Sequence, residues 1–234
     1  MSKAHHASDI AANVARIRER MARAAEQSGR SPADVTLVAA AKLVTAARVG
    51  EAIAAGVADI GENYLQEAAA KRPLVEAAAR WHMIGHLQRN KARQAAAIFD
   101  IIETVDSHRL AEAIGRQAQA LGRVAPVLLQ VNTSGEPSKH GVAPEQAEAL
   151  LRQVSETPGV RVEGLMTIGR WDPDPERARP EFRLLGELAR KLADSSGVGM
   201  RWLSMGMSHD FEVAIEEGAN LVRVGTGVFG PRPG

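Results

Sequence analysis

Apolar residues recur along the chain in short, nearly continuous runs, and longer stretches with helical spacing separate these runs. The clearest run is VTLVAAA at 35–41, whose lack of alternation is typical of a strand covered on both faces of a parallel sheet. Comparable runs follow at 57–61, 81–85, 99–105, 125–132, 162–169, 201–206 and 220–225. Together with the first run, this pattern predicts eight strands.

The intervening stretches carry apolar residues three or four positions apart, which is the spacing of amphipathic helices. The clearest of them contain Leu110, Ile114 and Leu121; Ala147, Leu150, Leu151 and Val154; Leu185, Leu188 and Leu192; and Phe211, Ala214 and Ile215. A further helix, from Ile10 to Met21, is expected before the first strand because its apolar residues share one face. Ser8 or Asp9 can cap this helix, and we expect residues 1–7 to be disordered.

Eight strand and helix units in 234 residues predict an α/β fold, a single (β/α)8 TIM barrel with an extra N-terminal helix. An open, doubly wound sheet is the alternative architecture. No composition break and no linker rich in proline, glycine and serine divides the chain, so we expect one domain over 1–234. Functional residues in such a barrel are expected on the loops that follow the strands.

Composition excludes several classes of function. The net charge of +1 gives no large field that would attract nucleic acid or an anionic membrane, so neither is an expected partner. The chain has no cysteine, which excludes disulfides, thiolate nucleophiles and cysteine-ligated zinc. The N-terminus is polar and no stretch is long and apolar enough for a membrane span, so we expect a cytoplasmic protein.

A single lysine, Lys42, ends the first apolar run. In a barrel this position lies at the catalytic mouth, and the small alanines before it leave room for a ligand. Burial lowers the pKa of a lysine, and the neutral amine can then form a Schiff base with a carbonyl compound. The alternative is a solvated lysine that simply ends a strand.

Two loops near the C-terminus are rich in glycine and hydroxyl residues, and each follows a predicted strand. The loops after strands seven and eight of barrels frequently build a phosphate site. Ser208 can cap the next helix and offer its hydroxyl, while Gly225 and Thr226 can present backbone N–H groups. Arg223 lies two residues before the second loop. The alternative is that these are ordinary turn residues and a helix cap.

Polar residues also follow the second predicted strand. Glu62 and Asn63 are expected at the mouth, beside the only tyrosine, Tyr64, where they could orient a ligand. The alternative is the start of a helix, with Asn63 as its cap.

Histidines His82 and His86 are four residues apart, the spacing of a helical metal pair. The apolar residues and glycine between them indicate a strand turning into a loop, so the two would not share a helix face, and we expect no metal site. The polar loop at 131–141 is expected to bring Asn132 and Ser134 to the mouth and to leave Lys139 in solvent.

A strand-end lysine combined with two phosphate loops suggests pyridoxal 5'-phosphate (PLP), because one group binds its aldehyde and the other its phosphate. Six motifs, in order and over nearly the whole chain, resemble the YggS/PROSC family of pyridoxal phosphate homeostasis proteins: LVAAAK, IGENYLQE, WHMIGHLQRNK, VNTSGEPSKHG, GLMTIG and LSMGMSHDFEVAIEEGANLVRVGTGVFG. Members of that family are single-domain barrels similar to the N-terminal domain of alanine racemase.

The resemblance implies a role for each matched residue. Lys42 would hold PLP as a Schiff base, and Ser208, Gly225 and Thr226 would bind its phosphate. Arg223 would face the pyridine nitrogen. Two further residues would lie around the cofactor ring: Asn63 and Met166. The sequence departs from the family beside the lysine, where Ala41 replaces a common serine and LVT replaces a frequent lysine-proline pair, which affects the polarity around the Schiff base.

The resemblance also implies a carrier or buffer of PLP that maintains vitamin B6 and amino-acid balance, with PLP-dependent apoenzymes as recipients and a monomeric state. Alanine racemase needs a second, β-rich domain, and the 234 residues leave no room for one, so we expect no robust catalysis. Two alternatives remain open: a single-domain PLP-dependent racemase or related enzyme, and a barrel isomerase or aldolase that uses Lys42 on a sugar phosphate.

Overall fold

A computed structural model describes residues 9–231 of the chain. The first helix, α1, spans Ile10–Gln27, and the Asp9 carboxylate caps it by accepting a hydrogen bond from the Ala12 N–H at 3.0 Å. Of the two predicted caps, Asp9 is therefore confirmed. The other predicted cap, Ser8, and the expectation of disorder for 1–7 lie outside the described residues.

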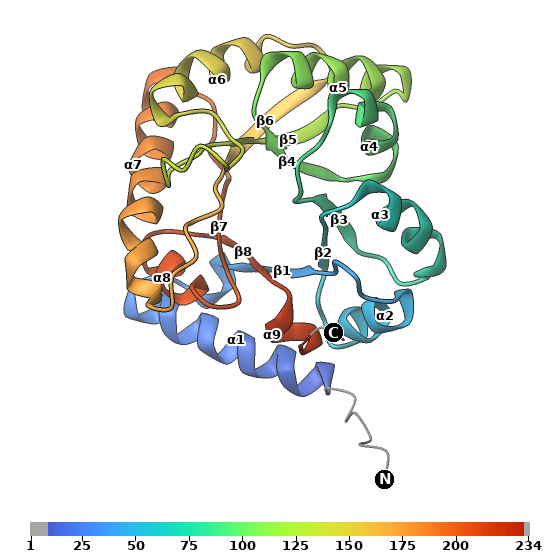
Figure 1. Cartoon of the computed structure of the whole chain (residues 1–234), viewed down its shortest axis with the longest axis vertical. Helices are drawn as coiled ribbons and strands as arrows, with labels where there is room; N and C mark the ends of the chain where they lie inside the picture. The colour runs from blue at the N-terminus through green and yellow to red at the C-terminus, as the bar shows by residue number, and fades with distance from the viewer. Residues whose placement is uncertain (1–8, 232–234) are drawn as a thin grey trace.

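Within residues 9–231, eight parallel strands form a closed barrel in chain order, as predicted (Figure 1). Their bounds are β1 Thr36–Ala40, β2 Asp59–Glu62, β3 Arg80–Met83, β4 Ile101–Val105, β5 Ala125–Gln130, β6 Val160–Met166, β7 Trp202–Met207 and β8 Leu221–Val224. The last strand pairs with the first, so the alternative of an open sheet is wrong. Closure leaves no exposed strand edge on the barrel.

Helices surround the barrel (Figure 1). Those after α1 are α2 Ala46–Ala54, α3 Leu65–Lys71, α4 Ala92–Ile98, α5 His108–Ala120, α6 Ala147–Ser155, α7 Arg179–Ser196, α8 Phe211–Glu216 and α9 Thr226–Phe229. Short 3-10 helices lie at η1 Pro32–Asp34, η2 Arg72–Leu74, η3 Arg89–Lys91, η4 Pro144–Gln146 and η5 Pro175–Ala178. None of the helices in the described part of the chain is long and apolar enough to cross a bilayer.

The N-terminal helix completes the outer layer. The helix after the last strand, α9, has four residues, which is too short to cover the neighbouring strands. Helix α1 packs along both α8 and α9 and buries its apolar face there, including Val14 and Ile17 (Figure 1). The extra helix therefore takes the place that a longer eighth helix would occupy.

Two layers make up the core. The larger lies between the strands and the helices and is rich in alanine, which lets the helices approach the sheet closely. The smaller fills the barrel, with one residue from each of six strands: Val38, Ile101, Leu128, Met166, Trp202 and Leu221. Buried polar side chains, among them His82, Glu103 and Arg223, also lie in the barrel.

Candidate functional site

Lys42 lies two residues after the end of β1 and is half-buried at the end of the barrel where the strands finish. Its ammonium lies 5.0 Å from the centre of the Tyr64 ring, which comes from the loop after the neighbouring strand β2. A ring face attracts a cation by its quadrupole. The lysine therefore rests against an aromatic surface at the mouth, where the sequence places it.

The backbone on both sides of Lys42 is held by helix α3. The Ala41 carbonyl accepts a hydrogen bond from the Lys71 ammonium at 2.8 Å, and the Leu43 N–H donates to the Glu67 carboxylate at 2.8 Å. Between residues 9 and 231, Leu43 is the one non-glycine residue with a positive φ, at 60°. Because this conformation disfavours side chains with a β-carbon, the two bonds serve to hold a strained turn.

The Glu62 carboxylate also belongs to this support and does not point into the mouth, so its expected role in orienting a ligand is wrong. It is fully buried and lies 2.6 Å from the Lys71 ammonium, on the side of β2 that faces α3. Burial raises the pKa of Glu62 to about 7, although the hydrogen bond from Lys71 opposes that rise. The pair anchors α3, and α3 in turn holds the backbone of residues 41–43 on both sides of Lys42.

The two C-terminal loops meet at Ser208. Its hydroxyl oxygen accepts hydrogen bonds from the Gly225 N–H at 3.2 Å and the Gly227 N–H at 3.4 Å. The loop after β7 and the loop after β8 therefore aim their polar groups at one point. Thr226 begins α9 between the two glycines, next to that point in the chain.

Ser208 does not cap the following helix, contrary to the sequence-based expectation. The N-cap of α8 is Asp210, whose carboxylate accepts a hydrogen bond from the Met207 N–H at 2.6 Å and so holds the turn. Gly206 makes this turn possible, because its φ is 89° and a β-carbon there would lie 2.6 Å from the Ala214 side chain. The hydroxyl is consequently free to face the other loop.

Strand pairing brings these loops beside the lysine. In the register of β1 and β8, Ala39 is paired with Val224, so the next residues, Ala40 and Gly225, are also neighbours. A β-carbon on Gly225 would lie 3.2 Å from the Ala40 carbonyl oxygen. The absence of that carbon lets the loop after β8 approach the end of the strand that precedes Lys42.

Arg223 lies inside the barrel below these loops and is almost completely buried. Its guanidinium donates to the Thr167 carbonyl at 2.7 Å and to the Ser204 hydroxyl, and it lies 3.9 Å from the Glu103 carboxylate. Burial lowers the pKa of Arg223 from its ordinary value, while the charge of Glu103 opposes this. An arginine still keeps its proton in proteins. The Arg223 guanidinium is therefore a fixed positive charge inside the barrel, below the loops after β7 and β8.

A chain of buried polar groups continues from Arg223 across the barrel, and sequence reasoning missed it. Ser204 donates to Glu103 at 2.6 Å, and the His82 ring bonds Glu103 at 2.7 Å and Asp59 at 2.8 Å. Burial alone would lower the pKa of His82, but the hydrogen bonds to the two carboxylates raise it to about 9. The two carboxylates therefore favour the protonated form of the buried His82 ring.

The remaining predicted residues occupy different surroundings. Met166 is fully buried among the apolar side chains inside the barrel. Asn63 is half-buried and lines, together with Tyr64 and His86, a cavity of about 430 Å³. Lys139 is not solvated as expected, because its ammonium donates to the Gly169 carbonyl at 2.9 Å. That bond ties the loop after β5 to the loop after β6.

Taken as chemistry, the arrangement offers a primary amine, two N–H groups that converge on one oxygen, and a buried guanidinium. The amine can condense with a carbonyl group. The N–H groups suit a phosphate, since backbone donors grouped at one point bind anions. A ligand that carries both an aldehyde and a phosphate would match this set of groups.

Comparison with known proteins places the chain in a family. A family model for the N-terminal domain of alanine racemase matches residues 6–233. The protein named pyridoxal phosphate homeostasis protein in Pseudomonas aeruginosa is 44% identical over 226 residues, covering 96% of each chain. Its namesake in Escherichia coli is 40% identical over 234 residues, covering 96% of this chain and 97% of the other.

The chain belongs to the pyridoxal phosphate homeostasis protein family. Among solved structures of similar proteins, PipY of Synechococcus elongatus with PLP bound is 37% identical and superposes with a TM-score of 0.83, covering 94% of this chain and all of that one. An alanine racemase of Clostridium difficile, 17% identical with a TM-score of 0.73, shares the fold alone over 56% of its own chain.

Proposed function

We propose that this member of the pyridoxal phosphate homeostasis family binds PLP as a Schiff base on Lys42, carries or buffers it, and so maintains vitamin B6 and amino-acid balance. The observation that carries the proposal is the position of one amine beside two converging loops, on adjacent strands at one end of the barrel. The family names and the PLP-bound structure of PipY support the same cofactor.

The phosphate would be bound by Ser208, Gly225 and Thr226. In the present structure the hydroxyl oxygen of Ser208 receives the N–H groups of Gly225 and Gly227, so donors for an oxygen acceptor are already aligned. A phosphate oxygen would be the stronger acceptor, because hydrogen bonds to an anion are stronger than bonds to a neutral hydroxyl. The residues therefore fit the group.

The ring would lie between this phosphate site and Lys42, with Asn63 and Met166 around it and Arg223 beneath its pyridine nitrogen. Bound PLP supplies an electron sink for carbanions formed next to its imine. Arg223 weakens that sink, because a guanidinium that keeps its proton leaves the pyridine nitrogen unprotonated. This placement favours holding the cofactor over using it for catalysis.

A carrier must also release its cargo. We propose that recipients are PLP-dependent apoenzymes, that the protein acts as a monomer in the cytoplasm, and that any racemase-type activity is weak. Exchange of the α-proton of amino acids in deuterated water separates the carrier from the racemase alternative. A carrier exchanges no faster than free PLP, whereas a racemase exchanges faster.

The cofactor itself is tested by the absorption spectrum of the purified protein with added PLP. The parent protein is expected to show the visible band of a Schiff base, and borohydride reduction followed by peptide mapping should place the adduct on Lys42. Lys42→Ala is expected to lose the band. Lys191→Ala is the matched control, because that lysine is 70% exposed on α7, and it should keep the band. An adduct spread over surface lysines would reject the proposal.

A further inference from the structure

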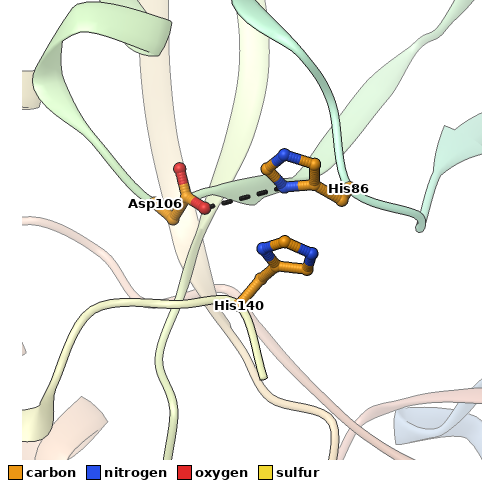
Figure 2. A group of neighbouring side chains, drawn as sticks. All are labelled: His86, Asp106 and His140. Carbon is orange, nitrogen blue, oxygen red and sulfur yellow. Dashed lines mark ion pairs between the residues drawn. The ribbon is translucent and has the colours of Figure 1, made fainter. Parts of the chain in front are cut away.

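Three side chains with metal-binding atoms meet at the loops that follow three consecutive strands, β3, β4 and β5. His86 comes from the loop after β3, Asp106 follows β4, and His140 lies in the loop after β5 (Figure 2). One ligand atom of each lies within 4.8 Å of the others. Because the three loops follow consecutive strands of a closed barrel, the fold itself brings these residues together.

A long ion pair between His86 and Asp106 is the one polar contact recorded within this cluster, and it is drawn as the dashed line in Figure 2. The His86 Nδ1 and the Asp106 carboxylate are 3.8 Å apart, which is beyond hydrogen-bond distance. The two imidazole rings are stacked face to face, with centres 3.8 Å apart and planes 9° from parallel (Figure 2). In this arrangement the ring nitrogens lie in the ring planes and are not directed at the other ring. Nitrogen and oxygen lone pairs are thus left side by side.

The backbone that carries these ligands is held from the interior. The buried Thr104 hydroxyl donates at 2.8 Å to the carbonyl of Gly85, the residue before His86. The Gln130 amide donates to the His140 carbonyl at 3.3 Å. After His140 the chain turns at Gly141, where φ is 115°. The ligand positions are therefore set by buried groups, while the rings themselves stay accessible.

We propose that His86, Asp106 and His140 bind a divalent transition-metal ion of the Zn²⁺ class. Two imidazoles and a carboxylate are a common donor set for zinc sites that keep an open position. Bonds of about 2.1 Å in a tetrahedron place ligand atoms about 3.4 Å apart, so no pair of ligand atoms has to close by more than about 1.4 Å. Rotation of the accessible side chains provides this movement. The fourth position is left for water or for a ligand that enters the mouth.

The experiment is a titration of the full-length protein, free of chelator, with Zn²⁺ by calorimetry and with Co²⁺ by absorption. The parent for these titrations carries His5→Gln and His6→Gln, because these adjacent histidines could bind metal on their own. His86→Gln, His140→Gln and Asp106→Asn remove the ligands one at a time. His209→Gln is the control, since this exposed histidine comes from the loop after β7.

The expected result is one ion per chain, with affinity falling at least about tenfold in each ligand variant. The His209→Gln and Lys42→Ala proteins should bind Zn²⁺ as the parent does, because neither residue belongs to the cluster. Retention of the parent's thermal unfolding midpoint without metal shows that a ligand variant is folded. Unchanged affinity in His86→Gln and His140→Gln, or the absence of a stoichiometric ion in the parent, would overturn the proposal. This result is independent of PLP binding, which the visible absorption spectrum of the protein with added PLP reports separately.

Discussion

The substitution His82→Gln is expected to remove about 2 kcal/mol of the loss of stability that the native protein shows between pH 7.5 and pH 10. In the fold, Asp59 and Glu103 hold the buried imidazolium, and the pKa of His82 is raised to about 9. In the unfolded chain the ordinary pKa is about 6.5. A raised pKa contributes stability that is complete below the unfolded value and is lost as the pH rises through the folded value.

The magnitude follows from these two pKa values. A shift from about 6.5 to about 9 corresponds to about 3 kcal/mol of unfolding free energy at low pH. Of this, about 2 kcal/mol remains at pH 7.5, and almost none remains at pH 10. Glutamine has no proton to lose in this range, so the variant lacks this decline. Starting at pH 7.5 also avoids most of the titration of Glu62, whose pKa is about 7.

The assay is urea unfolding followed by tryptophan fluorescence at both pH values. The native protein should lose about 2 kcal/mol more than His82→Gln between pH 7.5 and pH 10. His209→Gln, at an exposed histidine, should follow the native protein. Equal losses in the native protein and His82→Gln would refute the reasoning, since they would mean that His82 is neutral in the fold at pH 7.5.

Two further predictions concern the mouth. Ser208→Ala removes the hydroxyl on which the Gly225 and Gly227 N–H groups converge. It should weaken PLP retention about tenfold, as expected for a lost hydrogen bond to a charged group. Equilibrium dialysis measures retention, and equal retention in the variant would contradict the phosphate assignment. Leu43→Gly should raise the unfolding free energy by up to about 1 kcal/mol in urea titrations. Leu43 has a φ of 60°, which favours glycine, and its side chain is 63% exposed, so little packing is lost. A decrease in unfolding free energy would show that the turn is not strained.

The barrel could be predicted from the sequence because each strand is a local feature. The run at 35–41 contains β1, and the run at 220–225 contains β8, although each strand is shorter than its run. The location of Lys42 and of the two C-terminal loops at one mouth then follows from strand order alone. These parts of the site needed no knowledge of which way any side chain points.

Side-chain direction was the part that the sequence could not supply. In a parallel sheet covered on both faces, apolar residues do not alternate, so the strand pattern gives no inside or outside. Gly61 faces Val38 inside the barrel. Successive strand residues point to opposite faces, so the carboxylate of the next residue, Glu62, points outwards to α3. The signal for the buried network was available in a weaker form, as charged residues within otherwise apolar strands, such as Asp59 and Glu103.

The cluster of His86, Asp106 and His140 proposed as a metal site was equally hidden, because its members are separated by about twenty and thirty-four positions along the chain. The sequence pairs His86 with His82, four positions away, whereas the two side chains have different partners in the fold. Its partners, Asp106 and His140, follow the next two strands. Only the closed barrel makes those three loops adjacent.

Because α3 holds the backbone of residues 41–43, the loop after β1 cannot be redesigned independently of α3. The Ala41 carbonyl and the Leu43 N–H are both bound by side chains of the following strand–helix unit, Lys71 and Glu67. The first two units are therefore one exchangeable module and not two. A loop grafted from another barrel after β1 would lose its support unless α3 were transplanted with it.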